Sequence, residues 1–338
     1  MVGKSLKAKD AAPIMSKQDE TAATGVAGPL AASDVREWLK VHRIEEVECA
    51  VADIAGVARG KAMPASKFAE LKPTFLPVSI FFQDITGAYI DFEGDQDYTE
   101  GDLMMVPDLS TVRTAPWAKT PTAQVLHDAH WQSGREVEYA PRNVLKRVLR
   151  LYEAEGWKPV VAPEIEFYLT KTNPDPDYPL EPPVGRSGRP GTARQSYGLA
   201  GVDEYAGFVD DLYDFAEDQG LEIETIIQEG GSSQLEINLL HGDPLALADQ
   251  VYFFKRTLRE AALRHDCYAT FMAKPMENEP GSAMHATNPS SIRRPAPTCS
   301  ATRRASRPSC STASSPGCKR ICRARPAFSP PTSTLTAG

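Results

Sequence analysis

Two apolar segments of this chain carry acidic or amide side chains at every second position. The first contains Glu164 and Glu166. The second contains Gln234, Glu236 and Asn238. Because successive side chains of a strand point to opposite faces, the polar residues of each segment share one face and the apolar residues share the other. We therefore expect a sheet with a hydrophobic core on one side and converging carboxylates on the other. Such carboxylates need a counter-charge, and a divalent metal ion is the usual one.

The size and composition of the chain are typical of a globular protein. It has 338 residues, 41% of them hydrophobic, and a formal net charge of -8, which suits one large or two medium domains. No run of 18 apolar residues occurs, so we expect no membrane partner. Cys49 and Cys267 lie in well-patterned sequence, the other four cysteines follow residue 298, and no C-x-x-C motif occurs. This cysteine usage indicates a reducing cytoplasm.

Composition and hydrophobic periodicity divide the chain into four parts. Residues 1–32 are rich in Lys, Ala, Ser and Thr and are expected to be a disordered lead. Residues 33–136 favour a small β-rich domain, and residues 137–285 alternate helices with strands, which predicts an α+β fold. Residues 286–338 form a different kind of sequence. The periodicity predicts helices over 34–42, 141–155, 203–219 and 244–265, and strands over 47–53, 160–169, 223–227, 234–239 and 268–272.

The charge of the chain changes abruptly after residue 285. Residues 286–338 contain eight Arg, one Lys and no acidic residue, a charge of +9. Since the whole chain carries -8, residues 1–285 carry about -17. One interpretation of the last part is a basic disordered tail that touches nucleic acid. Apart from Phe328, however, it lacks aromatic residues between the basic ones, so nucleic acid is the less favoured partner.

Five short motifs follow one another along residues 53–285. They are D-I-A-G-V-A-R-G-K at 53–61, E-x-E at 164–166, the glutamates at 229 and 236 with Q-L-E-I-N-L, F-M-A-K-P at 271–275 and G-S-A-M-H at 281–285. Together they resemble the glutamine synthetase superfamily of ATP-dependent γ-glutamyl ligases. The resemblance covers roughly residues 35–285. It implies a β-grasp-like N-terminal domain, part of a glutamine-synthetase-type catalytic domain, and a homo-oligomeric ring with active sites between subunits.

The resemblance implies two divalent metal ions. Glu166, Glu229 and Glu236 match the ligands of the first ion, and Glu164 and His285 match two ligands of the second, near the ATP phosphates. Carboxylate oxygens suit Mg²⁺ or Mn²⁺. In this family the γ-carboxylate of glutamate attacks the γ-phosphate of ATP, and an amine opens the resulting acyl phosphate. The metal ions screen the repulsion between the two anionic partners.

Two further residues concern the substrates. Asp84 resembles a carboxylate that a neighbouring subunit lends to the ammonium site. Gly281 has no side chain and would let glutamate approach the backbone. Members that use ammonia usually read D-N-G-S-G in this loop, whereas here Pro280 replaces the glutamate-binding Asn. We therefore favour a larger amine, as in the γ-glutamylputrescine synthetases, with ammonia as the alternative.

The genetic code offers a second interpretation of residues 286–338. If each codon takes the third base of one residue and the first two of the next, residues 286–302 can encode H-Q-S-I-V-D-P-K-T-G-A-N-L-F-S-D. Residues 329–338 can encode A-P-Y-V-N-S-Y-R-R, and L-F-Y-R-F-I-A-G-L-Q-A-Y-L-P-R falls between. These strings resemble the continuation of a γ-glutamyl ligase. We infer a change of reading frame at or just after His285, through a sequencing error or a real lesion.

A change of reading frame has consequences for activity and packing. The chain as written would lack the last carboxylate of the second metal site and the arginines that the family uses on glutamate and phosphate. We expect it to be inactive, with the apolar faces of 234–239 and 244–265 left uncovered. Two other functions stay open: a non-catalytic remnant that co-assembles with an intact paralogue, and a basic-tailed nucleic-acid binder.

Overall fold

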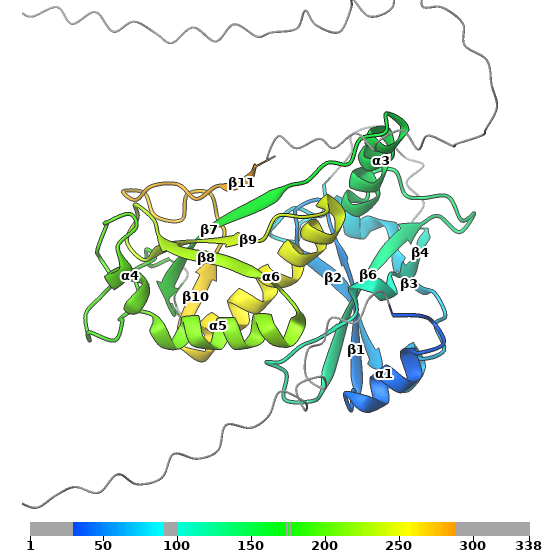
Figure 1. Ribbon diagram of the computed structural model, residues 1–338, viewed down its shortest axis with the longest axis horizontal. Coiled ribbons are helices and arrows are strands. Elements are labelled where there is room, and N and C mark those ends of the chain that lie inside the picture. The colour runs from blue at the N-terminus through cyan, green and yellow to red at the C-terminus, as the bar shows by residue number, and fades with distance from the viewer. Residues whose placement is uncertain (1–29, 91–100, 174, 176, 288–338) are drawn as a thin grey trace, which may run out of the picture. The chain divides into compact units, whose positions relative to one another are not determined.

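The computed structural model describes residues 30–90, 101–173, 175 and 177–287, which all lie within one compact unit (Figure 1). Most of the expected disordered lead, and the basic tail from residue 288 on, lie outside the described residues. Within those ranges, no helix is long and apolar enough to cross a membrane. The α+β prediction is confirmed, because helices and largely antiparallel strands alternate along the chain.

The first half of the described chain builds a mixed sheet. Its elements are α1 (Val35–Val41), β1 (Glu46–Ala52), β2 (Ala58–Pro64), α2 (Ala65–Phe68), β3 (Thr74–Pro77), β4 (Asp102–Pro107), β5 (Arg113–Thr114) and β6 (Thr122–His130), with 3₁₀ helices at Val78–Phe82 and Leu109–Thr111. The strand order is β2-β1-β6-β4-β3, and β5 also pairs with β6. β1 lies antiparallel to β2 and parallel to β6. That this region is a β-grasp-like domain with the expected boundaries stays a prediction.

A tight hairpin joins β1 to β2. Asp53 accepts hydrogen bonds from the backbone N–H of Val57 and from Nε of Arg59, both at 2.8 Å. A side chain at Gly60 would place its Cβ 2.1 Å from the carbonyl oxygen of Cys49. Pairing of these two strands therefore requires glycine at this position.

The second half builds an antiparallel sheet with helices beside it. Its elements are α3 (Pro141–Ala154), β7 (Ala162–Lys171), α4 (Leu199–Asp203), α5 (Ala206–Gln219), β8 (Ile223–Gln228), β9 (Gln234–Leu239), α6 (Pro244–Arg264), β10 (Cys267–Thr270) and β11 (Met284–Thr287). The strand order is β10-β7-β9-β8. β9 pairs with one edge of β7. Along the other edge, β10 pairs with the C-terminal part of β7 and β11 pairs with the N-terminal part of β7.

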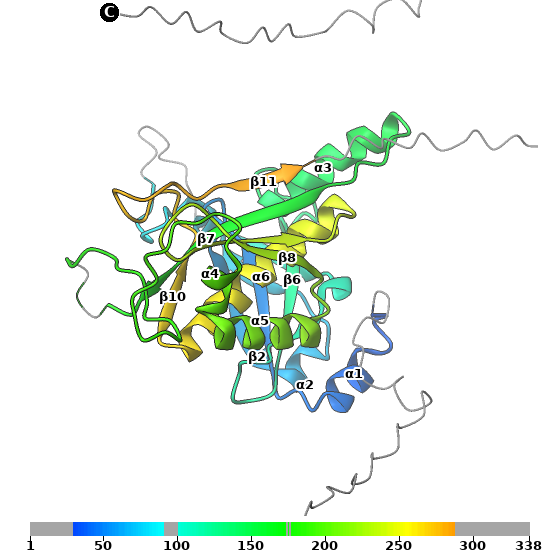
Figure 2. The same ribbon diagram turned by 60° about the vertical axis from the view of Figure 1, so that its left-hand side comes forward.

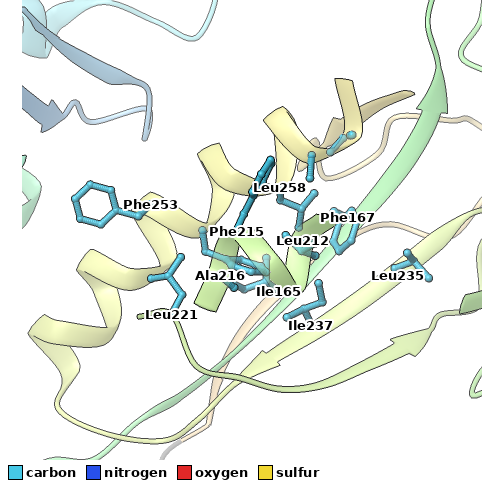
Figure 3. Close-up of a cluster of buried hydrophobic side chains, with 14 of the residues drawn as sticks. Ile165, Phe167, Leu212, Phe215, Ala216, Leu221, Leu235, Ile237, Phe253 and Leu258 are labelled. Carbon is cyan, nitrogen blue, oxygen red and sulfur yellow. The ribbon is translucent and has the colours of Figure 1, made fainter. Parts of the chain in front are cut away.

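Helices α5 and α6 cover the apolar face of the second sheet. Figure 3 shows the buried side chains that meet there, among them Ile165, Phe167, Leu212, Phe215, Leu235, Ile237 and Leu258. The expectation that 234–239 and 244–265 have uncovered apolar faces is wrong. Leu235, Ile237 and Leu239 are fully buried, because the helices on either side of β8 and β9 in the sequence fold back onto them.

Most of the expected helices and strands are present, with shifted ends. The helix expected over 203–219 is α5, which begins three residues later at Ala206, and the separate helix α4 ends at Asp203. α6 begins as expected, since Pro244 follows an N-cap at Asp243 whose carboxylate accepts hydrogen bonds from the N–H groups of Leu245 and Ala246. Strands β6 and β11 were not predicted from the sequence.

A cluster of charged side chains joins the two sheets. Arg142, in the first turn of α3, donates to both carboxylate oxygens of Asp249 on α6, at 2.9 and 2.8 Å. It also donates to Asp128 on β6 at 2.5 Å and to Asp108 after β4 at 2.6 Å. Lys146 adds a second cation against Asp128. A guanidinium shared by three carboxylates fixes α3, α6 and the first sheet relative to one another.

Candidate metal and substrate site

The face of the second sheet turned away from α5 and α6 carries the predicted acidic residues. In the β7–β9 register, Glu166 lies directly opposite Glu236, and Glu164 lies opposite Asn238. In the β7–β11 register, His285 lies opposite Glu164. Like charges placed directly opposite each other destabilise a sheet. Three strands therefore bring together an acidic group that calls for a cation.

The side chains of this face are close enough to share an ion. One ligand atom each of Glu164, Glu236 and His285 lie within 4.8 Å of one another. Nδ1 of His285 is 3.7 Å from a carboxylate oxygen of Glu164 and 3.6 Å from one of Glu166. Two carboxylates and an imidazole form a donor set that Mg²⁺ or Mn²⁺ accepts.

Electrostatics around Glu236 support the same interpretation. Glu236 is 8% exposed, and this burial raises the pKa of its carboxyl group. The negative charges of Glu229, Glu164 and Glu166 raise that pKa further. A carboxyl group held among other carboxylates lacks a counter-charge. The residues present therefore fit a bound divalent cation.

Two of the predicted ligands have other partners in the structure. Glu166 accepts hydrogen bonds from the N–H of Ala283 at 3.0 Å and from Nε2 of Gln234 at 3.3 Å. Glu229 follows β8, and its carboxylate accepts from the N–H of Gly230 at 3.2 Å. The structure thus groups Glu164, Glu236 and His285 most closely, whereas the resemblance divides these residues between two ions. The division stays a prediction.

The loop between β10 and β11 is held across this face by hydrogen bonds. Nε2 of Gln234 donates to the carbonyl oxygen of Gly281 at 3.0 Å, and the hydroxyl of Tyr168 donates to that of Pro280 at 2.7 Å. A Cβ at Gly281 would lie 2.9 Å from the carbonyl oxygen of Ala273. Gly281 is therefore needed for the close approach of two backbone segments, in addition to the role that the resemblance implies.

An ion pair between the buried carboxylate of Glu279 and the exposed guanidinium of Arg194 anchors the same loop, and sequence reasoning missed it. The carboxylate of Glu279 accepts from the guanidinium of Arg194 at 2.7 Å and from the hydroxyl and N–H of Ser232 at 2.8 and 3.0 Å. Burial raises the pKa of Glu279, but the bonds from Ser232 and Arg194 outweigh it and lower that pKa. In the sequence 85 residues separate Arg194 from Glu279, and nothing in the local pattern pairs them.

Asp84 is not a member of the group formed by Glu164, Glu236 and His285. It is exposed and accepts hydrogen bonds from Thr86 and from the N–H of Ala88 at 3.0 Å, which close a turn after the 3₁₀ helix at Val78–Phe82. Bonds from Thr86 lower the pKa of Asp84. Its action in a neighbouring subunit stays a prediction.

Comparison with known proteins identifies the family of this chain. Residues 138–302 match the family model described as "Glutamine synthetase, catalytic domain". The chain belongs to the glutamine synthetase superfamily. It is 34% identical over 260 residues to γ-glutamylputrescine synthetase PuuA of Escherichia coli K12, which covers 75% of this chain and 54% of that protein. It is 32% identical over 262 residues to a glutamate–isopropylamine ligase of a Pseudomonas species, covering 74% and 55%.

Solved structures agree with this assignment. GmaS without ligand superimposes with a TM-score of 0.61 and 25% identity, covering 77% of this chain and 56% of that one. The glutamine synthetase of Plasmodium falciparum gives a TM-score of 0.62 at 18% identity, which shows the shared fold alone. The chain spans about half the length of the curated relatives it matches. The motifs at 164–166, 229–236 and 281–285 thus led to the correct superfamily.

Proposed function

We propose that this chain represents an ATP-dependent ligase that joins the γ-carboxylate of glutamate to an amine through a γ-glutamyl phosphate. The observation that carries the proposal is the carboxylate and imidazole group of Glu164, Glu236 and His285 on one face of the second sheet. Transfer of a phosphoryl group between two anionic partners needs such a concentration of metal ligands. ATP and Mg²⁺ or Mn²⁺, at two sites, are the cofactors that the superfamily implies.

The residues of this chain would hold and orient the reactants. Glu164, Glu236 and His285, with Glu166 and Glu229 beside them, would bind the divalent ions. Bound metal ions would supply charge screening at the phosphates. Because Glu166 also accepts the N–H of Ala283, the strand that carries the ligands fixes the Gly281 loop at which glutamate is expected.

The amine is proposed to be larger than ammonia. Pro280 takes the place of the Asn that ammonia-using members carry, and it removes a side-chain amide that could bind glutamate's polar groups. Two relatives named for putrescine and isopropylamine are 34% and 32% identical over 260 and 262 residues. The glutamine synthetase of Methanosarcina mazei aligns over 261 residues at 30% identity. A primary alkylamine such as putrescine is therefore the favoured substrate, in a cytoplasmic homo-oligomer.

The chain as written is proposed to be inactive. Residues 286–338 contain no Asp or Glu, so they offer no further carboxylate to a metal site. The shifted frame can encode an acidic residue and the H-Q-S sequence after residue 286. A ligase of this kind would then require the frame-restored polypeptide.

The test compares the chain as written with a protein whose reading frame is restored by the insertion or deletion of one base after codon 285. Each is supplied with ATP, Mg²⁺ and glutamate, and then with putrescine, isopropylamine or ammonia. We expect ADP release and a γ-glutamylamine from the restored protein, fastest with an alkylamine, and neither from the chain as written. Substitution Glu236→Gln should abolish turnover, whereas the exposed Glu224→Gln serves as control. Turnover with none of the three amines would refute the proposal, and ammonia preference would refute the choice of amine.

A further inference from the structure

Asn238 lies within a row of residues that crosses four strands of the second sheet. His285 on β11 lies opposite Glu164 on β7, and Glu164 lies opposite Asn238 on β9. On the other side of β9, Thr225 of β8 lies opposite Asn238. In both views β11 runs beside β7 (Figures 1 and 2). Residues directly opposite each other on antiparallel strands have Cβ atoms about 4.5–5.5 Å apart, so the amide of Asn238 neighbours the carboxylate of Glu164.

Asn238 also shares a face of the sheet with Glu236. The two residues alternate along β9 with Ile237, which is fully buried in the core on the opposite face. The side chain of Asn238 therefore has one carboxylate beside it on its own strand and a second one across the strand pair. This position places a neutral polar group inside the acidic group described above.

The amide oxygen of Asn238 is buried and lacks a donor. Oδ1 is closed to solvent and accepts no hydrogen bond from any residue in the described part of the chain. Burial and three neighbouring carboxylates raise the pKa of Glu236, and a hydrogen bond from Asn238 acts against them. Since that bond favours the ionised carboxylate, the amide nitrogen must face Glu236 and the oxygen must point elsewhere. A buried acceptor without a donor costs about 1–3 kcal/mol, so Oδ1 calls for a positive partner.

A divalent cation in the acidic group would satisfy this oxygen. We propose that Oδ1 of Asn238 is a further ligand of the divalent cation held between Glu164 and Glu236. Amide oxygens are ordinary ligands of hard divalent cations, and this one adds an oxygen without adding to the repulsion among the glutamates. None of the ligands that the family resemblance implies is an amide. The inference rests on the metal site of the proposed function, but it does not depend on turnover.

Titration of the chain as written with Mn²⁺ tests the proposal, with free Mn²⁺ followed by electron paramagnetic resonance. Asn238→Leu keeps the size of the side chain and removes its oxygen, and it should bind Mn²⁺ about ten-fold more weakly than the parent chain. Asn238→Asp keeps an oxygen at this position and should bind at least as tightly as the parent. The control Asn278→Leu, at an exposed asparagine, should bind as the parent does. Equal affinity of Asn238→Leu and the parent, or no Mn²⁺ binding by the parent, would overturn the proposal.

Urea unfolding separates a ligand from a residue that only supports the fold. Asn238→Leu removes an acceptor that has no donor, so in EDTA the variant should be at least as stable as the parent chain. At one fixed concentration of Mn²⁺, the parent should gain more stability than the variant. A variant that is less stable in EDTA and gains as much from Mn²⁺ would overturn the proposal, because the amide would then serve the fold alone. Failure of the proposed reaction is separate, since it is measured as absence of turnover in the frame-restored protein and leaves the Mn²⁺ affinities unchanged.

Discussion

Replacement of Glu236 by Gln should stabilise the metal-free protein. Oxygen atoms of Glu164 and Glu236 lie within 4.8 Å of each other. Two like charges at that distance repel by about 3.5 kcal/mol at an effective dielectric constant of 20, and by about 1 kcal/mol in bulk water. Glu236 is nearly buried and Glu164 is partly exposed, so the free energy of unfolding should rise by about 1–2 kcal/mol. Gln keeps the size of the side chain and removes only its charge.

The same substitution should weaken stabilisation by metal ions. A divalent ion that binds the folded chain at ten times its dissociation constant stabilises it by about 1.4 kcal/mol. The assay is urea unfolding with EDTA and then with Mg²⁺ or Mn²⁺, for the parent chain, Glu236→Gln and the exposed control Glu224→Gln on β8. In EDTA, only Glu236→Gln should be more stable than the parent chain. On addition of Mg²⁺ or Mn²⁺, Glu236→Gln should gain less stability than the other two proteins. A loss of stability in EDTA would refute the reasoning, because it would show that the carboxylate is already satisfied without a cation.

Other regions of the structure make further predictions. Arg142→Met should cost about 3–5 kcal/mol in urea unfolding, because three aspartates lose their shared cation, whereas the exposed Arg147→Met should cost less than about 0.5 kcal/mol. Burial lowers the pKa of His127 from 6.5 to about 4. The unfolded chain therefore binds the proton first, and stability present above pH 6.5 should fall by up to about 3 kcal/mol as the pH drops toward 4. Unfolding of His127→Asn should lack that pH dependence. Glu279→Gln should lower stability by about 1–2 kcal/mol, measured against the exposed Glu277→Gln.

The second sheet was predicted well from the sequence, because the pattern that identifies its strands lies within each strand. Alternation along 160–169 and 234–239 is set by the period of a strand, and it places the carboxylates and the core on opposite faces. The structure has that arrangement, with Glu166 opposite Glu236 and Leu235 fully buried. The helix expected over 244–265 likewise begins at Pro244, as predicted. Patterns of this kind depend on neighbours in the sequence and are readable without a structure.

The elements that the sequence did not predict depend on distant residues. β6 contains the buried polar residues Gln124 and His127, and these interrupt the apolar run that would mark a central strand. Gln124 donates to the carbonyl oxygen of Thr114, and its other partners, Arg256 and Gln219, lie far along the chain. β11 is four residues long and exposed, and it is a strand because β7 offers it an edge. The Arg194–Glu279 pair could not be predicted from the sequence for the same reason, since its two residues lie far apart in the chain.

The order in which β7 acquires its neighbours has a consequence for synthesis of the protein. One edge of β7 is completed only by β10 and β11, and Cys267 is made 96 residues after Lys171. At ribosomal speeds this interval lasts about 5–20 s. An unpaired apolar strand edge invites pairing with other nascent chains, and charged side chains discourage it. We therefore expect Glu164 and Glu166 to discourage such pairing in the nascent chain until β10 and β11 have been made.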